Sequence, residues 1–211
     1  MDQFTGRDVR CVRGMRPVFS GVSFALASGE ALILRGPNGS GKSSLLRLMA
    51  GLSRPDAGTI EWNGAAIRND PEAHAARLAY LGHSDAVKPG LSIAANARLW
   101  TRLRGGTDDM ADAALARFGL AQRGPLPARL LSAGQRKRLA LARTTAAPGA
   151  LWLLDEPGAA LDADGVAALL DSIARHRDAG GMVVASAHGE IAIPGAAALD
   201  LAAFAAAEQA A

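Results

Sequence analysis

Residues 31–43 read ALILRGPNGSGKS, a short apolar run followed by a glycine-rich loop that ends in lysine and serine. From Gly36 to Ser43 the loop fits the pattern Gly-x-x-x-x-Gly-Lys-Ser. The glycines let the backbone curl so that successive N–H groups point at phosphate oxygens, and a following helix adds the positive end of its dipole. The alternative is a glycine-rich turn that only caps a helix. A predicted strand before the loop and helical spacing in SSLLRLM after it favour phosphate binding.

This loop indicates a nucleotide together with its magnesium ion. The Lys42 ammonium is expected to bridge the β- and γ-phosphates of ATP, which makes it a candidate catalytic residue, and the Ser43 hydroxyl is expected to bind Mg²⁺. ATP and Mg²⁺ are therefore the expected cofactors. The predicted nucleotide-binding residues of the loop are Gly36, Pro37, Asn38, Gly39, Ser40, Gly41, Lys42, Ser43 and Ser44.

Two acids stand at the end of a second apolar stretch, LWLLDEP, at residues 151–157. A short all-apolar run of this kind predicts a strand buried on both faces of a parallel sheet. Ligands of doubly wound sheets bind at the carboxyl ends of the strands, so Asp155 and Glu156 are expected beside the phosphate-binding loop. Asp155 suits a magnesium ligand, and Glu156 suits the base for an attacking water. Two acids at a surface strand end are the alternative, which the phosphate-binding loop disfavours.

The remaining pattern predicts an α/β fold without internal repeats. Residues 7–35 favour β-structure, and residues 91–119 show helical spacing interrupted at Gly105-Gly106. The alanine-rich segment from about Pro194 onward carries no motif, so a strand, a helix and a mobile tail all remain open for it.

Composition excludes several classes of protein. The chain has 211 residues, enough for one sizeable core, and no apolar run approaches the ~20 residues of a spanning helix. Its N-terminus has no apolar segment typical of a secretory signal. Cys11 is the single cysteine, which excludes an internal disulfide and fits a reducing cytosol. The net charge of +3 comes mostly from dispersed arginines, so we expect no direct binding of nucleic acid.

Residues 131–135 read LSAGQ directly before a predicted helix. Ser132 as N-cap with Gln135 three residues later forms a capping box, yet free N–H groups at a helix start also bind anions. The phosphate-binding loop, LSAGQ, the strand ending in DEP and a histidine after the apolar run MVVASA follow one another in this order. Jointly they resemble the ATP-binding cassette (ABC) ATPase family over nearly the whole chain.

The resemblance implies a single nucleotide-binding domain over residues 1–211. Its fold would be α/β, a P-loop NTPase-type core with an antiparallel β subdomain and a helical subdomain inserted at about residues 85–145. Two copies would pair head to tail on ATP binding. Each nucleotide would lie between one chain's phosphate-binding loop and the other chain's LSAGQ segment at residues 131–135, the signature loop. Glu156 would be the catalytic base, and His188 the switch residue at the γ-phosphate. The implied nucleotide contacts of the signature loop are Ser132, Gly134 and Gln135.

Two positions depart from the family's pattern. Near the N-terminus, where an aromatic residue usually stacks on adenine, the register places Arg13, with Cys11 or Val12 if the register slips. A guanidinium plane can also stack on adenine. In the loop after LAYLG, Ser84 stands where a glutamine normally contacts Mg²⁺ and the attacking water. A serine hydroxyl can bind Mg²⁺ with a shorter reach, so we expect slower or differently coupled hydrolysis.

The short chain, the segment SLLRLMAGLSRPDAGTI and the LGH loop are similar to one branch of the family, the ATP-binding subunits of heme exporters for cytochrome c maturation. The implied partners are integral membrane permease subunits, with an indirect link to heme. The implied location is peripheral, on the cytoplasmic face of the inner membrane. An importer or a lipid or ion exporter is the first alternative. A soluble ABC ATPase and a P-loop kinase or GTPase are less favoured, because long coiled-coil insertions and guanine-specifying motifs are missing from the sequence.

Overall fold

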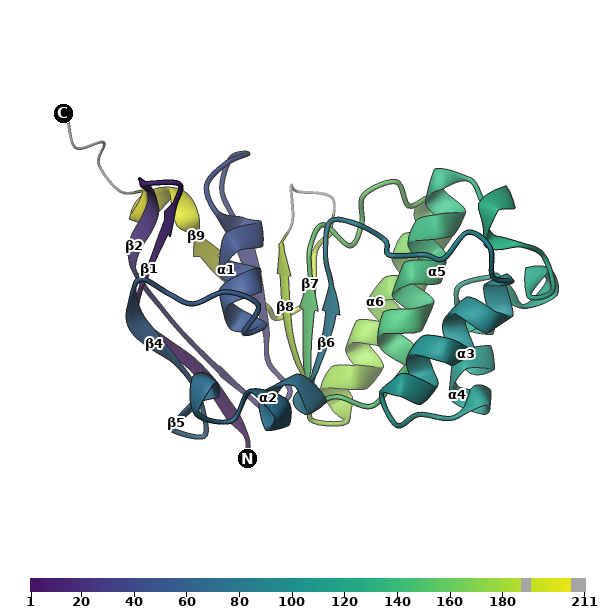
Figure 1. Ribbon diagram of the computed structural model, residues 1–211, viewed down its shortest axis with the longest axis horizontal. Helices are drawn as coiled ribbons and strands as arrows, with labels where there is room; N and C mark the ends of the chain where they lie inside the picture. Colours follow the sequence, from purple (N-terminus) through teal and green to yellow (C-terminus); the bar gives the residue numbers. More distant parts are fainter. Residues whose placement is uncertain (187–190, 206–211) are drawn as a thin grey trace.

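The computed structural model describes residues 1–186 and 191–205, which form two β-sheets and the helices around them (Figure 1). The antiparallel sheet has the order β2-β1-β4-β5, and the parallel sheet has the order β6-β7-β8-β3-β9. The antiparallel strands are β1 (Gln3–Arg13), β2 (Arg16–Ala27), β4 (Ala57–Trp62) and β5 (Ala65–Ala66). The parallel strands are β3 (Ala31–Arg35), β6 (Leu78–Leu81), β7 (Leu151–Leu154), β8 (Met182–Ser186) and β9 (Ala197–Asp200).

Six α-helices accompany the sheets in the described part of the chain. They are α1 (Lys42–Met49), α2 (Pro71–Arg77), α3 (Ile93–Leu103), α4 (Asp108–Arg117), α5 (Ala133–Ala146) and α6 (Ala163–Asp178). Their starts follow ordinary capping chemistry: Ser92, Thr107 and Asp162 accept hydrogen bonds from first-turn N–H groups of α3, α4 and α6. Helices α3, α4 and α5 lie together on one side of the parallel sheet, away from the antiparallel sheet (Figure 1).

The parallel sheet is buried on both faces, as the apolar run LWLLDEP predicts. Along β7, Trp152 and Leu154 enter a core shared with α3 to α6, while Leu151 and Leu153 enter a second core shared with α1 and the antiparallel sheet. Successive side chains of a strand point to opposite faces, so one strand contributes to both cores. This arrangement holds the strand ends in fixed positions from both sides.

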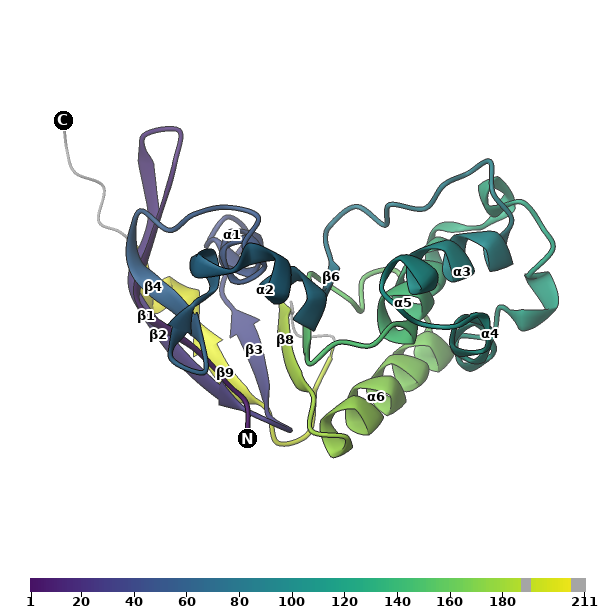
Figure 2. The same cartoon turned by 60° about the horizontal axis from the view of Figure 1, so that its bottom comes forward.

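The β1–β2 hairpin is longer than the strand beside it. Strand β4 pairs with β1 only as far as Arg10, so the hairpin continues alone to its turn at Gly14 and Met15 (Figure 2). Asp8 adopts a left-handed φ of 49° within a bulge, where Gly58 of the neighbouring strand approaches its backbone. A Cβ on Gly58 would lie 2.4 Å from the Asp8 carbonyl oxygen, which explains the glycine.

The expected α/β fold with an antiparallel sheet and a group of inserted helices is confirmed, and two elements refine it. Helix α2 was not predicted, although Asp70 caps it and Pro71 occupies its first turn, which are known start signals. For the C-terminal segment, the sequence allows a strand, a helix or a mobile tail. Its residues 197–200 form β9, parallel to β3, and a short 3₁₀ turn follows at Leu201–Phe204.

Candidate functional site

The loops that carry the predicted site residues meet at one edge of the parallel sheet. Strands β3, β6, β7 and β8 are parallel, so their carboxyl ends lie on the same side. The phosphate-binding loop follows β3, the two acids follow β7, and Ser84 follows β6. Strand β8 lies between β3 and β7, and His188 in the segment after it falls outside the described residues. Ligands of open α/β sheets bind at this edge.

The phosphate-binding loop wraps around the Lys42 side chain, which is only 6% exposed. The Lys42 ammonium donates hydrogen bonds to the carbonyl oxygens of Gly36 (2.7 Å) and Pro37 (2.9 Å). These bonds hold the cation inside the curve of the loop. A bound phosphate would offer stronger, charged acceptors to the same ammonium.

Two glycines of the loop are required by its shape. Gly41 has a φ of 100°, and a Cβ on it would lie 2.7 Å from side-chain atoms of both Val18 and Phe19. Gly36 has a φ of 130°, and its Cβ would meet Ser40 Oγ at 2.6 Å. A left-handed backbone and close neighbours therefore exclude larger residues at both positions.

The start of α1 offers unused donors to an anion. Gly41 is the N-cap of α1 and has no side chain, so no side-chain cap satisfies the first-turn N–H groups. Ser40 Oγ is buried and has no hydrogen-bond partner among the described residues. The Ser43 side chain is exposed beside them. A phosphate with its magnesium ion fits these groups, because serine hydroxyl and carboxylate oxygens are the ligands that Mg²⁺ prefers.

The rest of the loop leaves its backbone accessible. Pro37, Asn38 and Gly39 are exposed, and Gly36, Ser40, Gly41 and Ser44 are half-buried. The structure therefore brings all the predicted phosphate-binding residues together in one curved segment between β3 and α1. Their role in binding a nucleotide stays a prediction.

The two acids are held by a serine that sequence reasoning missed. Asp155 is 2% exposed, and its Oδ1 accepts a hydrogen bond of 2.7 Å from Ser186 Oγ. The same oxygen of Ser186 accepts a bond of 2.8 Å from the Glu156 backbone N–H. Glu156 has a left-handed φ of 46°, which an L-residue adopts only when its surroundings impose it. Ser186 at the end of β8 thus fixes both acids of the neighbouring strand.

The loop after β6 lies against α5. Ser84 is exposed, as is His83 before it. Asp85 next to it lies near Lys137, whose side chain is buried on α5 although lysine is usually exposed. The start of this loop also contacts the acids, because the Asp155 N–H donates to the Leu81 carbonyl oxygen at 2.8 Å. The loop is thereby joined to β7 at one end and, at the other, to α5, which we call the signature helix because it follows the sequence LSAGQ.

The signature loop forms the capping box that its sequence allows. Ser132 Oγ accepts from the Gln135 N–H at 3.3 Å, and Gln135 Oε1 accepts from the Ser132 N–H at 3.1 Å. Gly134 faces the segment after β7, since a Cβ on it would lie 2.8 Å from the Ala160 carbonyl oxygen. Arg138 of α5 pairs with Asp162, the N-cap of α6. The signature loop and the segment 160–162 therefore form one packed unit.

This unit does not meet the phosphate-binding loop of the same chain. Helix α1 lies on one side of the strands β6, β7 and β8, and α5 lies on the other, in both views (Figures 1 and 2). The predicted nucleotide contacts Ser132, Gly134 and Gln135 are accordingly separated from Lys42 by the sheet. One copy of the chain cannot surround a nucleotide with both loops.

Arg13 ends β1 at the tip of the hairpin, with its side chain exposed. The Cys11 thiol interacts with both Arg13 and Ser44 of α1. Burial raises the pKa of the Cys11 thiol, and interactions with Arg13 and with Ser44 of α1 oppose that rise. Arg13 therefore lies near the first turn of α1, where the register predicts the adenine contact.

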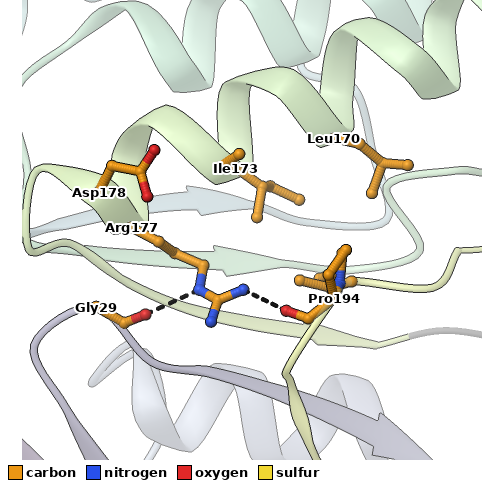
Figure 3. Close-up of a pocket in the computed structure, with 8 residues that line it drawn as sticks. Gly29, Leu170, Ile173, Arg177, Asp178 and Pro194 are labelled. Carbon is orange, nitrogen blue, oxygen red and sulfur yellow. Dashed lines mark hydrogen bonds between the residues drawn. The ribbon is translucent and has the colours of Figure 1, made fainter.

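A separate hollow lies at the opposite edge of the sheet, before β3 begins (Figure 3). It has a volume of about 210 Å³. Arg177 spans it, donating to the carbonyl oxygens of Gly29 (2.8 Å) and Pro194 (2.6 Å). These bonds tie α6 to the start of β3 and to the segment before β9, so we interpret Arg177 as a structural tie rather than a ligand site.

Two further findings concern metal and membrane. Within residues 1–186 and 191–205 there is no cluster of three or more His, Cys, Asp or Glu side chains that would hold a metal by itself. No helix in the described part of the chain is long and apolar enough to cross a bilayer.

Comparison with known proteins shows which family this chain resembles. The model of the ABC transporter family matches residues 19–159. The cytochrome c biogenesis ATP-binding export protein CcmA of Paramagnetospirillum magneticum is 55% identical over 210 residues, covering 98% of this chain and 97% of the relative. The CcmA protein of Rhodospirillum rubrum is 55% identical over 202 residues, covering 96% and 87%.

The solved structures agree in fold. An ABC transporter ATP-binding protein from Pyrococcus furiosus superposes with a TM-score of 0.85 at 23% identity, covering 97% of this chain and all of that one. A second ATP-binding subunit of an ABC transporter gives 0.80 at 24% identity, covering 88% and 79%. The chain therefore belongs to the ABC transporter family, in the group of the CcmA cytochrome c biogenesis ATP-binding export proteins.

Proposed function

We propose that this chain is the ATP-hydrolysing subunit of a membrane export complex that serves cytochrome c maturation, with heme or a heme-handling protein as cargo. The proposed ATP hydrolysis rests on the arrangement of side chains at the carboxyl edge of the parallel sheet. There, Lys42 lies inside the phosphate-binding loop and Ser186 holds Asp155 and Glu156. The cargo is inferred from the CcmA relatives, whose names state cytochrome c biogenesis and export.

Each group at this edge has a distinct chemical task in the proposal. The Lys42 ammonium, now on loop carbonyls, would move to the β- and γ-phosphates and neutralise charge that develops on them. Ser43 and Asp155 would hold Mg²⁺, which supplies charge neutralisation between the phosphates. Glu156 would orient an attacking water and accept its proton. Ser84 would add a shorter polar contact than the family's glutamine, and His188 would contact the γ-phosphate.

We further propose that two copies join head to tail around two nucleotides. The separation of the signature loop from Lys42 by the sheet supports this arrangement, because a second copy is needed to bring Ser132, Gly134 and Gln135 to a nucleotide. Their capping box leaves an exposed Ser132 at the start of α5, where free N–H groups favour an anion. Arg13 would stack on the adenine of its own chain.

The proposed location is the cytoplasmic face of the inner membrane. The chain would be held there by integral membrane permease subunits, since the described helices do not cross a bilayer themselves. Heme would then be handled by the membrane subunits, and its link to this chain would be indirect.

The test of hydrolysis uses Glu156→Gln, with Glu72→Gln on α2 as a matched control at an exposed position. We expect wild-type protein to release phosphate from ATP and Mg²⁺, and Glu156→Gln to be slower by about 10²-fold or more while it still binds ATP. Light scattering of the Glu156→Gln protein with ATP should show a dimer. A rate within about threefold of wild type would contradict the assigned base, and a persistent monomer that binds ATP would contradict the head-to-tail arrangement.

The test of cargo is made in cells. Removing the chain should abolish covalent attachment of heme to c-type cytochromes, and wild-type protein should restore it while Glu156→Gln should not. Normal c-type cytochromes in cells without the chain would refute the maturation role and favour another ABC transporter.

A further inference from the structure

Lys137 places a buried positive charge next to the acidic edge. It lies in the second turn of α5, its side chain is 7% exposed, and its Nζ is 3.9 Å from Asp85 Oδ1. Burial lowers the pKa of Lys137, while the charges of Asp85, Asp155 and Glu156 raise it again. The signature helix therefore carries a buried cation beside the Asp85 carboxylate of the loop after β6.

A second cation of α5 binds the same loop through its backbone. Arg143 donates to the carbonyl oxygens of Asp85 (2.7 Å) and Ala86 (2.6 Å), and its guanidinium lies 4.9 Å from the centre of the Trp100 ring. Ala86 has a left-handed φ of 48°, a conformation that needs support when the residue is not glycine. Arg143 thus fixes the path of the loop, and Lys137 engages the one carboxylate at this point of it.

Packing alone does not account for a lysine here. Burying an ammonium is costly unless opposite charges compensate it, and an apolar side chain of similar volume would fill the space without that cost. The 3.9 Å separation is also too long for a hydrogen bond, so Lys137 acts on Asp85 mainly through charge. Lys88 on the same loop is exposed, so its ammonium has no comparable cost of burial.

We propose that Lys137 is a positioning residue for ATP hydrolysis, which holds the loop after β6 against α5 through its charge. The inference rests on the proposed hydrolytic function and adds a residue to it. Lys137 touches no reacting atom in this proposal. It acts through Asp85, which is next to Ser84 in the sequence.

The position of Lys137 on α5 gives the arrangement a consequence for the proposed dimer. Ser132 begins the same helix, five residues earlier, or about 7 Å along the axis. Movement of the loop after β6 against Lys137 would therefore be passed to the signature loop that serves the other nucleotide. Loss of the Lys137 charge should slow turnover while leaving ATP affinity intact, because the phosphate-binding loop leads into α1, which lies on the far side of the sheet from α5 (Figure 1).

The experiment compares steady-state hydrolysis and ATP affinity for wild type, Lys137→Met, Lys137→Arg, Asp85→Asn and the double variant Asp85→Asn/Lys137→Met. Lys88→Met is the control. We expect Lys137→Met to lower kcat about tenfold with an ATP Kd within about twofold of wild type. Lys137→Arg should keep most of the activity. The double variant should be no slower than the slower single variant, because both changes break the same interaction.

The outcomes separate this inference from the proposed function. A wild-type chain that does not hydrolyse ATP refutes the function itself. An active wild type with Lys137→Met within about twofold of its kcat overturns the positioning role, as does a loss in Lys137→Arg equal to that in Lys137→Met. If Lys137→Met does not fold, Asp85→Asn carries the test, since the Asp85 side chain is partly exposed. A lowered kcat with unchanged ATP Kd supports the inference, and an unchanged kcat overturns it.

Discussion

Ser186→Ala removes the hydroxyl that holds the two acids together. The Ser186 side chain is completely buried, and its oxygen makes two hydrogen bonds, to Asp155 Oδ1 (2.7 Å) and from the Glu156 N–H (2.8 Å). Alanine fits the same space in β8 without these bonds. The Glu156 N–H then loses the hydrogen bond that favours its left-handed backbone conformation. The Asp155 carboxylate loses the hydrogen bond that it accepts from the Ser186 hydroxyl.

The magnitude follows from the two bonds. A hydrogen bond to a charged group contributes about 1.5–3 kcal/mol, and a buried donor left unpaired costs about 1–3 kcal/mol. If about 2 kcal/mol of this total is lost from the placement of Glu156 in the transition state, kcat falls about 30-fold, since 1.4 kcal/mol corresponds to a factor of ten. The ATP Kd should stay within about twofold, because the hydrogen bonds of the Ser186 hydroxyl go to Asp155 and Glu156 and not to the phosphate-binding loop.

The assay measures phosphate release over a range of ATP concentrations, together with ATP binding and thermal unfolding of each variant. Ser172→Ala is the matched control, because Ser172 is a buried serine whose hydroxyl donates within α6 to the Ala168 carbonyl oxygen at 2.8 Å. It should lower stability without changing kcat. A Ser186→Ala kcat within about twofold of wild type, or an equal loss of ATP affinity, would refute the reasoning.

Two further predictions concern the signature loop and pH. Gly134→Ala places a Cβ 2.8 Å from the Ala160 carbonyl oxygen, so the loop must shift. The kcat should fall about tenfold, and a kcat equal to that of wild type would contradict the packing. Burial lowers the pKa of His176, which is stacked 4.0 Å from Trp152, from 6.5 to about 4. Below pH 6.5 the His176 imidazole is therefore protonated in the unfolded chain but stays neutral in the folded chain. The free energy of unfolding that is present above pH 6.5 falls by up to about 3 kcal/mol as the pH decreases to 4. His176→Phe should flatten that part of the denaturation-against-pH curve, and an unchanged slope would assign it to other groups.

The phosphate-binding loop was predictable because its requirements are local. Gly36 and Gly41 need left-handed backbone in a segment of eight residues, and the strand before them and helix after them have clear periodicity. The acids after β7 were predictable for a similar reason, since an apolar run ends at Asp155. In each case the residues that define the chemistry are adjacent in sequence.

The supporting contacts were not predictable in this way. Ser186 is 31 residues from Asp155 in the sequence and lies in the apolar run MVVASA, where a serine carries no signal of its own. Its partnership depends on β8 being placed between β3 and β7, which no local pattern states. Lys137 was hidden in a run of three basic residues, which suggests a solvated face, and the contact with Asp85 depends on how α5 packs against the loop after β6.

The sequence leaves the C-terminal segment open among a strand, a helix and a mobile tail for a different reason. The side chains of β9 are mostly exposed or half-buried, so the apolar alternation that marks a strand is weak there. What holds this segment is the hydrogen-bonded pairing of residues 197–200 with β3, together with the completely buried Leu201. Backbone pairing at a sheet edge leaves little trace in the sequence, whereas a buried strand such as β7 leaves a strong one.

The contacts that support the site come from different elements of the fold. The phosphate-binding loop depends on its own glycines and on β3, whereas the acids depend on β8 and the loop after β6 depends on α5. Changes at Ser186 should therefore act through the two acids rather than through the phosphate-binding loop. Changes at Lys137 act through α5, the same helix that begins with the exposed signature serine Ser132. Arg143 holds the backbone of the loop after β6 to α5 by two hydrogen bonds, and the charge of Lys137 on Asp85 adds a second tie between the loop and the signature helix.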